Sequence, residues 1–481
     1  MKNTWWVAPV TALVILLVFA LLPPLSPLTP LGMKVVGIFF FTIVLWVFVG
    51  ISFPSLISLA LFAVLGIMAP KELFAVSMGN WIVIFIIACL GLADGLRATG
   101  FSRRFALWFM SRSFTRNRPW MLLAMTMLAS TILGSIMSST AAFIVFMAVV
   151  APMLEAAGYK KGDHFSTVFM MGLAWATTAA FMITPIGHGS NVLLIEWVER
   201  DMGYIITFAK WIAVGIPVGL LIYLLVLGIL RFGIRPDVSQ FSTSATDYVT
   251  EERNKLGKIT LEEKLAIGIF LSVVACWVLP GIASGILPGI SSYLKGIGYA
   301  VPALIGVGLL CLIRTKNQPL LSFSEWMKNM EWGAIMLIIA IMAFGAVIGD
   351  PETGISELLT NIFTPVARSA PFPVFLFVSI LWAGFQTNIM SNMVTAILVY
   401  TIMVPAAIAA GVGNPAALGF SIFAATRSAF AFPSATVVTA LVTGSGWVPV
   451  SYMLRWGLVT IIPIVLIIAF ICYPLATAIF K

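Results

Sequence analysis

Long apolar runs, separated by short polar segments, make up most of this 481-residue chain. A helix that crosses a bilayer needs about 20 mostly apolar residues, and eleven runs approach or exceed that length. They occupy residues 6–22, 33–51, 53–68, 76–96, 165–197, 207–231, 264–281, 295–313, 331–349, 416–447 and 452–478. The pattern therefore predicts an all-α polytopic membrane protein with about 11 transmembrane helices.

Two further apolar stretches, 121–155 and 371–410, each contain a cluster of small polar residues near the middle. Each arm of the first stretch has about 16 residues, or roughly 24 Å of helix, which is short for a span once a turn is removed. Two short spans would also place both ends on one side of the membrane. A re-entrant hairpin is favoured because an uncharged tip of Ser138, Ser139 and Thr140 suits backbone buried in protein at membrane depth. We therefore predict two re-entrant hairpins.

Breaks that contain proline interrupt two of the long apolar runs. Pro185 and Pro433 are separated by 248 residues (433 − 185), and so are Asn191 and Thr439 (439 − 191). Proline removes a backbone donor and clashes with the preceding turn, so each run is predicted to form two half-helices around an unwound segment. A single break of this kind is common in transmembrane helices. Its duplication indicates two inverted repeats, as in secondary transporters.

The hairpin tips repeat as well. The sequence Ile-Met-Ser-Ser at 136–139 recurs as Ile-Met-Ser-Asn at 389–392. Carbonyls, hydroxyls and side-chain amides at unwound positions suit a hard cation such as sodium. The N-termini of half-helices suit carboxylate, sulfate or phosphate oxygens. The duplicated arrangement therefore predicts paired cation and anion sites.

Composition and charge define the environment of the chain. Hydrophobic residues form 61% of it and charged residues 9%, a balance that excludes a water-soluble surface. Arginines crowd residues 97–118 and lysines lie at 160–161, so both segments are predicted to face the cytoplasm. We expect a multi-pass protein of the cell inner membrane with a cytoplasmic N-terminus and an external C-terminus. The segment 6–22 is expected to be retained, because it lacks a cleavage pattern.

The polar stretch 232–262 is predicted to be a cytoplasmic linker between two halves. It ends in a capping-box pattern at Thr260 and Glu263. The other predicted divisions are 1–120 as the scaffold part of repeat 1 with a cytoplasmic amphipathic segment, 121–231 as its transport part, 263–370 as the scaffold part of repeat 2, and 371–481 as its transport part. Each transport part is predicted to hold one hairpin and one broken helix.

Several other classes of protein lack support in the sequence. The four cysteines lie singly in apolar runs, without metal-ligand or redox spacing. Paired catalytic carboxylates, a nucleophile motif and a phosphate-binding loop are missing from the sequence, so neither an enzyme nor a primary pump is expected. The net charge of +9 reflects membrane orientation, and no nucleic-acid partner is expected. An anion channel is less favoured but stays open, because a hairpin tip can also form a filter.

The second tip and break resemble those of a known family. The tip reads Ser391, Asn392 and Met393 with Thr387 before it, and the break at 433–446 reads Pro-Ser-Ala-Thr-Val-Val-Thr-Ala-Leu-Val-Thr-Gly-Ser-Gly. The chain thus resembles the divalent anion/sodium symporters, which carry dicarboxylates, citrate or sulfate and have Ser-Asn-Thr tips and Thr-Pro breaks. The resemblance extends over nearly the whole chain in order and spacing. It implies a homodimer whose transport parts move like an elevator.

The chain also departs from the family pattern. Ser139 stands where the first tip usually has a carboxamide, and Met393 stands where the second tip usually has a threonine. The first break reads His-Gly-Ser-Asn at 188–191 in place of Thr-Pro-Pro-Asn, and valines replace two prolines of the second break. A serine at the first tip leaves more room and one fixed oxygen fewer, which is compatible with a changed substrate or weaker sodium coupling.

The resemblance and the isolated polar residues together define the candidate site. One sodium ion is implied near Ser138, Ser139 and Gly187, and another near Thr387, Asn392 and Ala435. The substrate-binding candidates are Ser138, Ser139, Thr140, His188, Ser391, Asn392, Met393, Thr436 and Arg427. Arg427 can hold a substrate anion, or it can pair with a carboxylate or snorkel outward. His188 can donate to an anion and titrate near neutral pH, or it can serve as a neutral hydrogen-bonding residue.

The expected function is sodium-coupled uptake of a small divalent anion of the dicarboxylate class by an elevator mechanism. Sodium would act as a coupling ion and not as a prosthetic group. The main alternatives are a sodium-independent anion exchanger and a carrier of sulfate or another oxyanion. Uptake measured with and without sodium separates these possibilities. The lipid bilayer and a second copy of the chain are the other expected partners.

Overall fold

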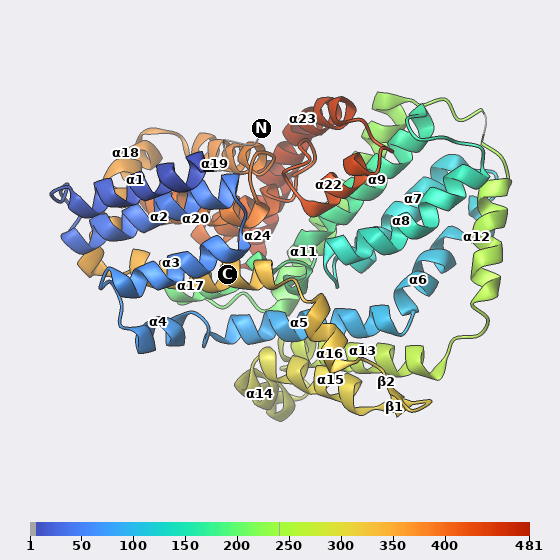
Figure 1. The fold of residues 1–481 in the computed structure, drawn as a ribbon, viewed down its shortest axis with the longest axis horizontal. Helices are drawn as coiled ribbons and strands as arrows, with labels where there is room; N and C mark the ends of the chain where they lie inside the picture. The colour runs from blue at the N-terminus through green and yellow to red at the C-terminus, as the bar shows by residue number, and fades with distance from the viewer. Residues whose placement is uncertain (1–5, 240) are drawn as a thin grey trace. The chain divides into compact units, whose positions relative to one another are not determined.

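The computed structural model describes residues 6–239 and 241–481, and Figure 1 shows that it is built almost entirely of helices. In this described part, eight helices are long and apolar enough to cross a membrane, and two bent helix pairs raise the number to ten. Shorter apolar helices accompany them. A two-stranded hairpin of β1 (Arg314–Thr315) and β2 (Gln318–Pro319) is also present. The predicted all-α polytopic membrane fold is confirmed.

The chain divides into two compact units. The first contains residues up to Ile87, together with Asn329–Phe375 and Thr401–Pro415. The second contains Ala88–Lys328, Leu376–Tyr400 and Ala416–Lys481. All the candidate site residues lie in the second unit, which is therefore described at greater length. The division into scaffold and transport parts stays a prediction.

The first unit is a group of apolar helices with an aromatic core. It contains α1 (Val7–Leu21), α2 (Pro30–Phe48), α3 (Ser52–Val64), α4 (Pro70–Val76), α17 (Trp332–Ile348), the 3₁₀ turn η5 (Pro351–Thr353) and α18 (Ile355–Ser369). The ring centroid of Phe344 in α17 lies 4.9 Å from that of Phe62 in α3 and 5.6 Å from that of Phe39 in α2. Thr42 and Ser58 share a buried hydrogen bond of 2.6 Å. Paired hydroxyls of this kind avoid the cost of an unsatisfied polar group between two apolar helices.

Most of the remaining helices belong to the second unit. They are α6 (Phe101–Met110), η1 (Ser113–Thr115), α7 (Pro119–Gly134), α8 (Ser139–Ala156), α9 (His164–Ala179), η2 (Ala180–Met182), η3 (Pro185–Gly187), α10 (Gly189–Met202), α11 (Phe208–Gly228), η4 (Ile229–Ile234), α12 (Ser244–Lys255), α13 (Leu261–Ile282), α14 (Pro288–Ile297), α15 (Ala300–Leu312), α16 (Phe323–Asn329), α21 (Pro415–Ala425), α22 (Val437–Gly444), α23 (Val450–Ile467), η6 (Ile468–Cys472) and α24 (Tyr473–Ile479). Helices α5 (Trp81–Ala98), α19 (Phe372–Gln386) and α20 (Asn392–Ala410) have residues in both units, and α16 and α21 each have one end residue, Asn329 and Pro415, in the first unit.

Helix α9 forms the core of the second unit. Every residue from Phe165 to Ala179 is buried, so this part of the helix has no solvent or lipid face, and its serine and threonine hydroxyls are buried with the apolar side chains. Its Trp175 ring stacks on Phe430 at 5.2 Å and donates to the carbonyl oxygen of Phe430 at 3.1 Å. Because Phe430 lies between α21 and α22, these contacts hold α9 against the second break.

Several predicted spans differ from the structure in detail. The helix of the run at 76–96 begins only at Trp81. The run at 295–313 is not one straight helix, because α14 and α15 meet at 81°. Gly298 ends α14 with a φ of 69°, a conformation that glycine adopts without steric cost. The helix predicted at 53–68 ends earlier, at Val64.

The linker contains a helix, α12, that the sequence pattern did not predict. Asp247 lies in its first turn, and Arg253 and Lys255 lie in its last turn, an arrangement that complements the helix dipole. Arg103 of α6 pairs with Glu252 of α12 at 2.7 Å. The polar composition of the linker therefore reflects a charged surface helix that docks on α6.

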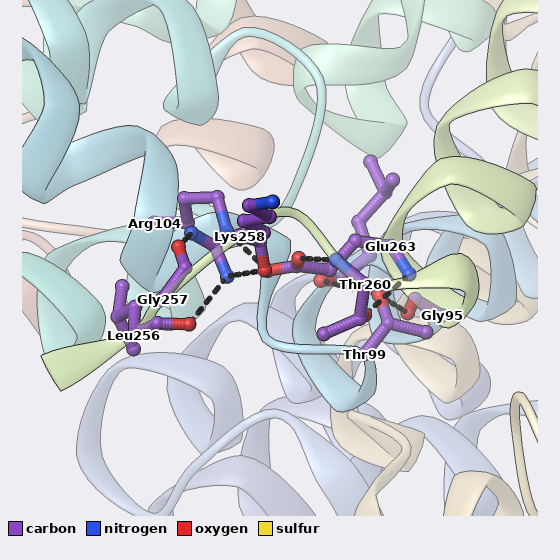
Figure 2. Close-up of polar contacts among 9 residues, drawn as sticks. Gly95, Thr99, Arg104, Leu256, Gly257, Lys258, Thr260 and Glu263 are labelled. Carbon is purple, nitrogen blue, oxygen red and sulfur yellow. Dashed lines mark hydrogen bonds and ion pairs between the residues drawn. The ribbon is translucent and has the colours of Figure 1, made fainter. Parts of the chain in front are cut away.

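Arg104 of α6 holds the end of the linker, as Figure 2 shows. Its guanidinium pairs with Glu263 at 2.7 Å and donates to the carbonyl oxygens of Gly257 at 2.8 Å and Leu256 at 3.1 Å. Thr260 and Glu263 form the predicted capping box at the start of α13, with reciprocal bonds of 3.2 Å and 2.7 Å. These bonds satisfy two backbone N–H groups that the first helical turn leaves free.

Candidate functional site

Both stretches predicted as hairpins form two helices joined by a short turn. In the first, α7 ends at Gly134 and α8 begins at Ser139. In the second, α19 ends at Gln386 and α20 begins at Asn392. The tip residues Ser139 and Asn392 are therefore first residues of helices and not turn residues. Their side chains lie where a helix presents free backbone N–H groups.

Both predicted breaks are present at corresponding positions. After the first break α10 starts with His188 as its N-cap, and after the second α22 starts with Thr436 as its N-cap. These two residues are 248 apart (436 − 188), the same separation as the two prolines. The third helical residues, Asn191 and Thr439, both turn their side chains back to carbonyl oxygens of the preceding break. The local sequence therefore sets equivalent helix starts in the two halves.

Asn191 closes the first break. Its side-chain Nδ2 donates to the carbonyl oxygen of Phe181 at 2.6 Å and to that of Thr184 at 2.9 Å. The hydroxyl of Thr184 donates in turn to the carbonyl oxygen of Ser135 in the first hairpin turn. A Cβ atom on Gly187 would lie 2.9 Å from the carbonyl oxygen of Phe181, so only glycine fits there. These bonds join the first hairpin to the first break.

Asn388 joins the second hairpin to the second break, and the sequence alone did not assign it a role. Its Nδ2 donates to the carbonyl oxygens of Gly384 at 2.8 Å and Ser428 at 3.0 Å. Its Oδ1 accepts from the backbone N–H groups of Phe430 at 2.9 Å and Ala431 at 2.8 Å. The side chain is 1% exposed, and its two donors and two acceptor sites are all used. A carboxamide in the middle of an apolar hairpin was the feature of the sequence that could have indicated this role.

Thr387 and Asn392, two of the three implied ligands of one sodium ion, lie together. The hydroxyl of Thr387 is 2.9 Å from Asn392 Oδ1 and 2.9 Å from the carbonyl oxygen of Thr426. Both side chains are buried. Several oxygens within such distances are the environment that hard cations prefer. The third implied ligand, Ala435, lies in the second break, where its N–H donates to the carbonyl oxygen of Phe432 at 3.0 Å.

Arg427 comes from the second break and reaches the start of α10 after the first break. It is 1% exposed. Its Nη2 donates to Ser190 Oγ at 2.7 Å and to Asn191 Oδ1 at 2.8 Å. Within the described part of the chain, Nε and Nη1 have no hydrogen-bond partner. Arg427 therefore neither snorkels outward nor, among the described residues, pairs with a carboxylate.

His188 caps α10. Its Nδ1 accepts from the backbone N–H of Ser190 at 3.3 Å and lies 2.8 Å from Ser190 Oγ. The imidazole ring centroid is 4.8 Å from that of Phe181. The ring thus orients Ser190, which also receives a hydrogen bond from Arg427. Direct contact of His188 with a substrate stays a prediction.

The other candidate residues lie at the tips and at the second break. Ser138 is the N-cap of α8, Ser139 and Met393 are buried, and Thr436 uses its hydroxyl to accept from the N–H of Thr439 at 3.1 Å. Thr140 lies in the first turn of α8, and Ser391 immediately precedes α20. Their assignment to a substrate stays a prediction.

The arrangement can bind ions of both signs within one unit. The oxygens around Thr387 suit a small cation, while the Arg427 guanidinium beside the N-terminus of α10 suits an anion. The groups are held by unwound backbone inside a helical membrane fold. Secondary transporters place their solutes at broken helices of this kind, and that is the class of protein that the fold and the site define.

Residues 41–431 match the citrate transporter family, and the chain belongs to that family. The resemblance to the divalent anion/sodium symporters is thereby confirmed. Membership places the chain among transporters and not among enzymes.

Named relatives cover nearly the whole chain. The sodium-dependent dicarboxylate transporter SdcS of Staphylococcus saprophyticus is 26% identical over 460 residues, which cover 91% of this chain and 86% of SdcS. SdcS of Staphylococcus aureus strain USA300 is 24% identical, with the same two coverages. An uncharacterised transporter of Haemophilus influenzae is 24% identical and covers 95% of both chains.

Two solved transporter structures share the fold. MtrF of Neisseria gonorrhoeae superposes with a TM-score of 0.58 at 14% identity, over 96% of this chain and 94% of MtrF. YdaH of Alcanivorax borkumensis gives a TM-score of 0.50 at 13% identity, over 84% and 86% of the two chains. At such low identity the likeness concerns the fold alone.

Proposed function

We propose that this protein is a secondary active transporter that couples sodium to the uptake of a small dicarboxylate. The observation that carries the proposal is the buried guanidinium of Arg427, which has no carboxylate partner among the described residues. An uncompensated charge in a protein interior is unfavourable, and a carboxylate of the substrate would complete its hydrogen bonds. The names of the SdcS relatives support a dicarboxylate, and the name of the citrate transporter family supports a carboxylate substrate more broadly.

The sodium ion is assigned to the oxygen cluster of Thr387, Asn392 and the carbonyl of Thr426. In the structure the Thr387 hydroxyl donates within this cluster. A hydroxyl can rotate so that its lone pairs face a cation, and the three oxygens would then all serve as ligands. Because the cluster shares a hairpin turn with Asn388, sodium binding would order the tip against the second break. This gives a physical route by which sodium favours substrate binding.

The substrate is assigned to the region between the tips and Arg427. The residues proposed to contact it are Ser138, Ser139, Thr140, His188, Ser391, Asn392, Met393, Thr436 and Arg427. Each hairpin is hydrogen-bonded to the break of its own half, and Arg427 joins the two breaks. Such a bonded group would move as one body, which supports an elevator motion. We further propose a homodimer in the inner membrane with a cytoplasmic N-terminus.

Uptake into proteoliposomes tests the proposal. The purified protein would be reconstituted, and labelled succinate would be supplied with sodium or with potassium outside, at a clamped membrane potential. Saturable uptake that requires sodium is the expected result, and protein-free liposomes provide the background. Uptake that does not saturate with succinate would identify a channel and contradict the proposal.

A sodium-independent exchanger is the second candidate function, and the serine at the first tip favours it. Ser139 stands where Asn392 stands in the second half, so the first half has fewer fixed oxygens for a cation. Exchange is measured by loading the liposomes with unlabelled succinate or sulfate and omitting sodium. Rapid labelled uptake only into loaded liposomes would identify an exchanger. If sulfate competes with labelled succinate for uptake, the substrate class extends to oxyanions.

A further inference from the structure

The two halves of the site differ at positions that correspond in the repeat. The tips are offset by 253 residues, so Asn392 corresponds to Ser139 (392 − 139) and Thr387 corresponds to Gly134 (387 − 134). The second half therefore offers a hydroxyl and a carboxamide where the first half offers a hydrogen atom and a shorter hydroxyl. The loss of one hydroxyl, and the exchange of a carboxamide oxygen for a shorter hydroxyl, weaken a cation site in the first half.

A side chain at Gly134 would be crowded by its neighbours. A Cβ atom on Gly134 would lie 3.1 Å from the Ala180 side chain and 3.1 Å from the carbonyl oxygen of Thr177. Both contacts are tighter than ordinary packing, because α7 and α9 approach closely here. The corresponding hydroxyl of Thr387 instead donates to the carbonyl oxygen of Thr426. The close packing of the first half thus disfavours the ligand that the second half provides.

The carbonyl oxygens of the first break already have donors from the protein. Asn191 donates to those of Phe181 and Thr184, and the Thr184 hydroxyl donates to that of Ser135. A sodium ion needs lone pairs that face it, and these bonds occupy part of that capacity. The Thr387 hydroxyl of the second half can rotate and offer a lone pair to a cation, whereas the Asn191 amide nitrogen has no lone pair to offer. The first break is therefore the less suited of the two to hold a cation.

A positive charge is nevertheless present at the first break, because Arg427 reaches it from the second. The guanidinium has five N–H groups, and the two on Nη2 are used by Ser190 and Asn191. The three on Nε and Nη1 have no partner among the described residues. The side chain is thus fixed at one end and keeps, at the other, buried donors that the oxygens of an anion would satisfy.

We infer that Arg427 is a built-in cation that takes the place of a sodium ion in the first half of the site, so that one sodium accompanies each divalent anion. This inference rests on the proposed function and defines its stoichiometry. One sodium and Arg427 together neutralise a bound dianion. Arg427 stays with the protein, so each transport cycle moves one net negative charge with the substrate.

This charge movement has a physiological consequence. A membrane potential that is negative inside opposes net uptake of one sodium with a dianion. Exchange of an internal dianion for an external one moves no net charge and is unaffected by the potential. One carrier can therefore take up its substrate when the sodium gradient is large and exchange substrates when the gradient is small.

Potential-dependent uptake tests the inference. Proteoliposomes would contain valinomycin and defined potassium gradients, and labelled succinate would be supplied at pH 7.5, where it is a dianion. We expect a hyperbolic dependence on sodium concentration, and uptake accelerated by a potential that is positive inside. A sigmoidal sodium dependence, or uptake that is indifferent to potential, would show two sodium ions and overturn the inference while leaving the proposed function intact. Absence of any sodium-stimulated uptake would contradict the proposed function itself.

Variants of Arg427 provide the second arm. Arg427→Gln removes the charge, and we expect the apparent affinity for succinate to fall at least tenfold. Arg427→Lys keeps the charge and should retain the sign of the potential dependence. Arg455→Gln is the matched control, because Arg455 is exposed on α23 and should leave uptake unchanged. If Arg427→Gln fails to fold, the sodium and potential dependence of the parent and of Arg427→Lys still decide the question. If the Arg427→Gln variant folds and binds succinate as tightly as the parent protein, the role of Arg427 is refuted.

Discussion

Arg427 Nη2 donates to the side-chain oxygen of Asn191 at 2.8 Å, although 236 residues separate the two in the sequence. The nitrogen of the same carboxamide donates to two carbonyl oxygens of the first break. The network therefore assigns the orientation of the amide, with its oxygen toward the guanidinium. One side chain thus closes the first break and positions a residue of the second.

Replacing Asn191 with Asp should reduce substrate affinity. The new carboxylate would neutralise Arg427 from inside the protein and compete with the substrate. It would also lose the Nδ2 bonds to Phe181 and Thr184, so the thermal midpoint of the variant is measured beside its affinity. We expect the succinate affinity to fall by about tenfold or more, because hydrogen bonds to charged groups contribute roughly 1.5–3 kcal/mol. Binding would be measured by titration calorimetry in detergent. Asn361→Asp, the same change at an exposed position of α18, should leave the affinity unchanged, and equal affinities in both variants would contradict this role of Asn191.

Replacing Asn388 with Asp should destabilise the fold. The amide donors to Gly384 and Ser428 would be lost, and a carboxylate would face two carbonyl oxygens. Each unsatisfied buried group costs about 1–3 kcal/mol, so we expect a loss of roughly 3 kcal/mol or more. The midpoint of thermal unfolding in detergent measures the effect, again with Asn361→Asp as the control. A midpoint equal to that of the parent would show that the hairpin does not depend on these bonds.

Replacing Asn392 with Leu should abolish sodium-stimulated uptake. The change removes an oxygen from the cluster with Thr387 and inserts an apolar group of similar size. The protein should stay folded, which size-exclusion chromatography would verify. Thr395→Val is the matched control, because Thr395 is buried one turn further along α20 and its hydroxyl has no partner among the described residues. Sodium dependence that survives in Asn392→Leu would mean that the sodium site lies elsewhere.

Substitutions of His188 should separate capping from substrate contact. Asn is a good N-cap residue, so His188→Asn should keep the start of α10. His188→Leu should lower stability by about 1 kcal/mol, a usual cost for losing an N-cap, and should misplace Ser190. Thermal unfolding and succinate affinity would be measured for both. If His188→Asn keeps its stability but loses its affinity, the imidazole itself contacts the anion.

Docking of the linker helix α12 should weaken in acid. Hydrogen bonds from Lys255, with the nearby charge of Arg103, hold the pKa of Glu252 below its usual range. The pKa of Glu252 is lower in the docked state than its unfolded value of about 4.3. The ionised carboxylate therefore stabilises the docked state fully at a pH above that unfolded pKa. This stabilisation is lost as the pH falls through the lower pKa of the docked state. The pairs are partly exposed, so the effect should stay below about 1 kcal/mol. Hydrogen exchange of α12 between pH 5 and pH 3, corrected for intrinsic rates, measures it. Glu252→Gln should flatten this dependence, and a parental profile in that variant would assign the effect to other groups.

The sequence by itself determined the elements and the places where they stop. Apolar length predicts the spans, and Pro185 and Pro433 predict that two of them are interrupted, because proline lacks a backbone donor. The breaks are longer than the prolines alone require, since α9 and α21 already end at Ala179 and Ala425. The N-caps His188 and Thr436 and the capping box at Thr260 are equally local, since each satisfies N–H groups within the next helical turn. Corresponding helix starts in the two halves could therefore be predicted from spacing alone.

Only the tertiary structure decided which polar groups meet. Arg427 had three possible roles in the sequence, and its bonds to Ser190 and Asn191 became visible only when the two breaks came together. Asn388 has bonds to residues about forty positions away, and the close packing at Gly134 depends on a neighbouring helix. A buried polar group must find partners wherever the packed helices bring them. That choice depends on distances between segments remote in the chain, which periodicity and motif spacing do not encode.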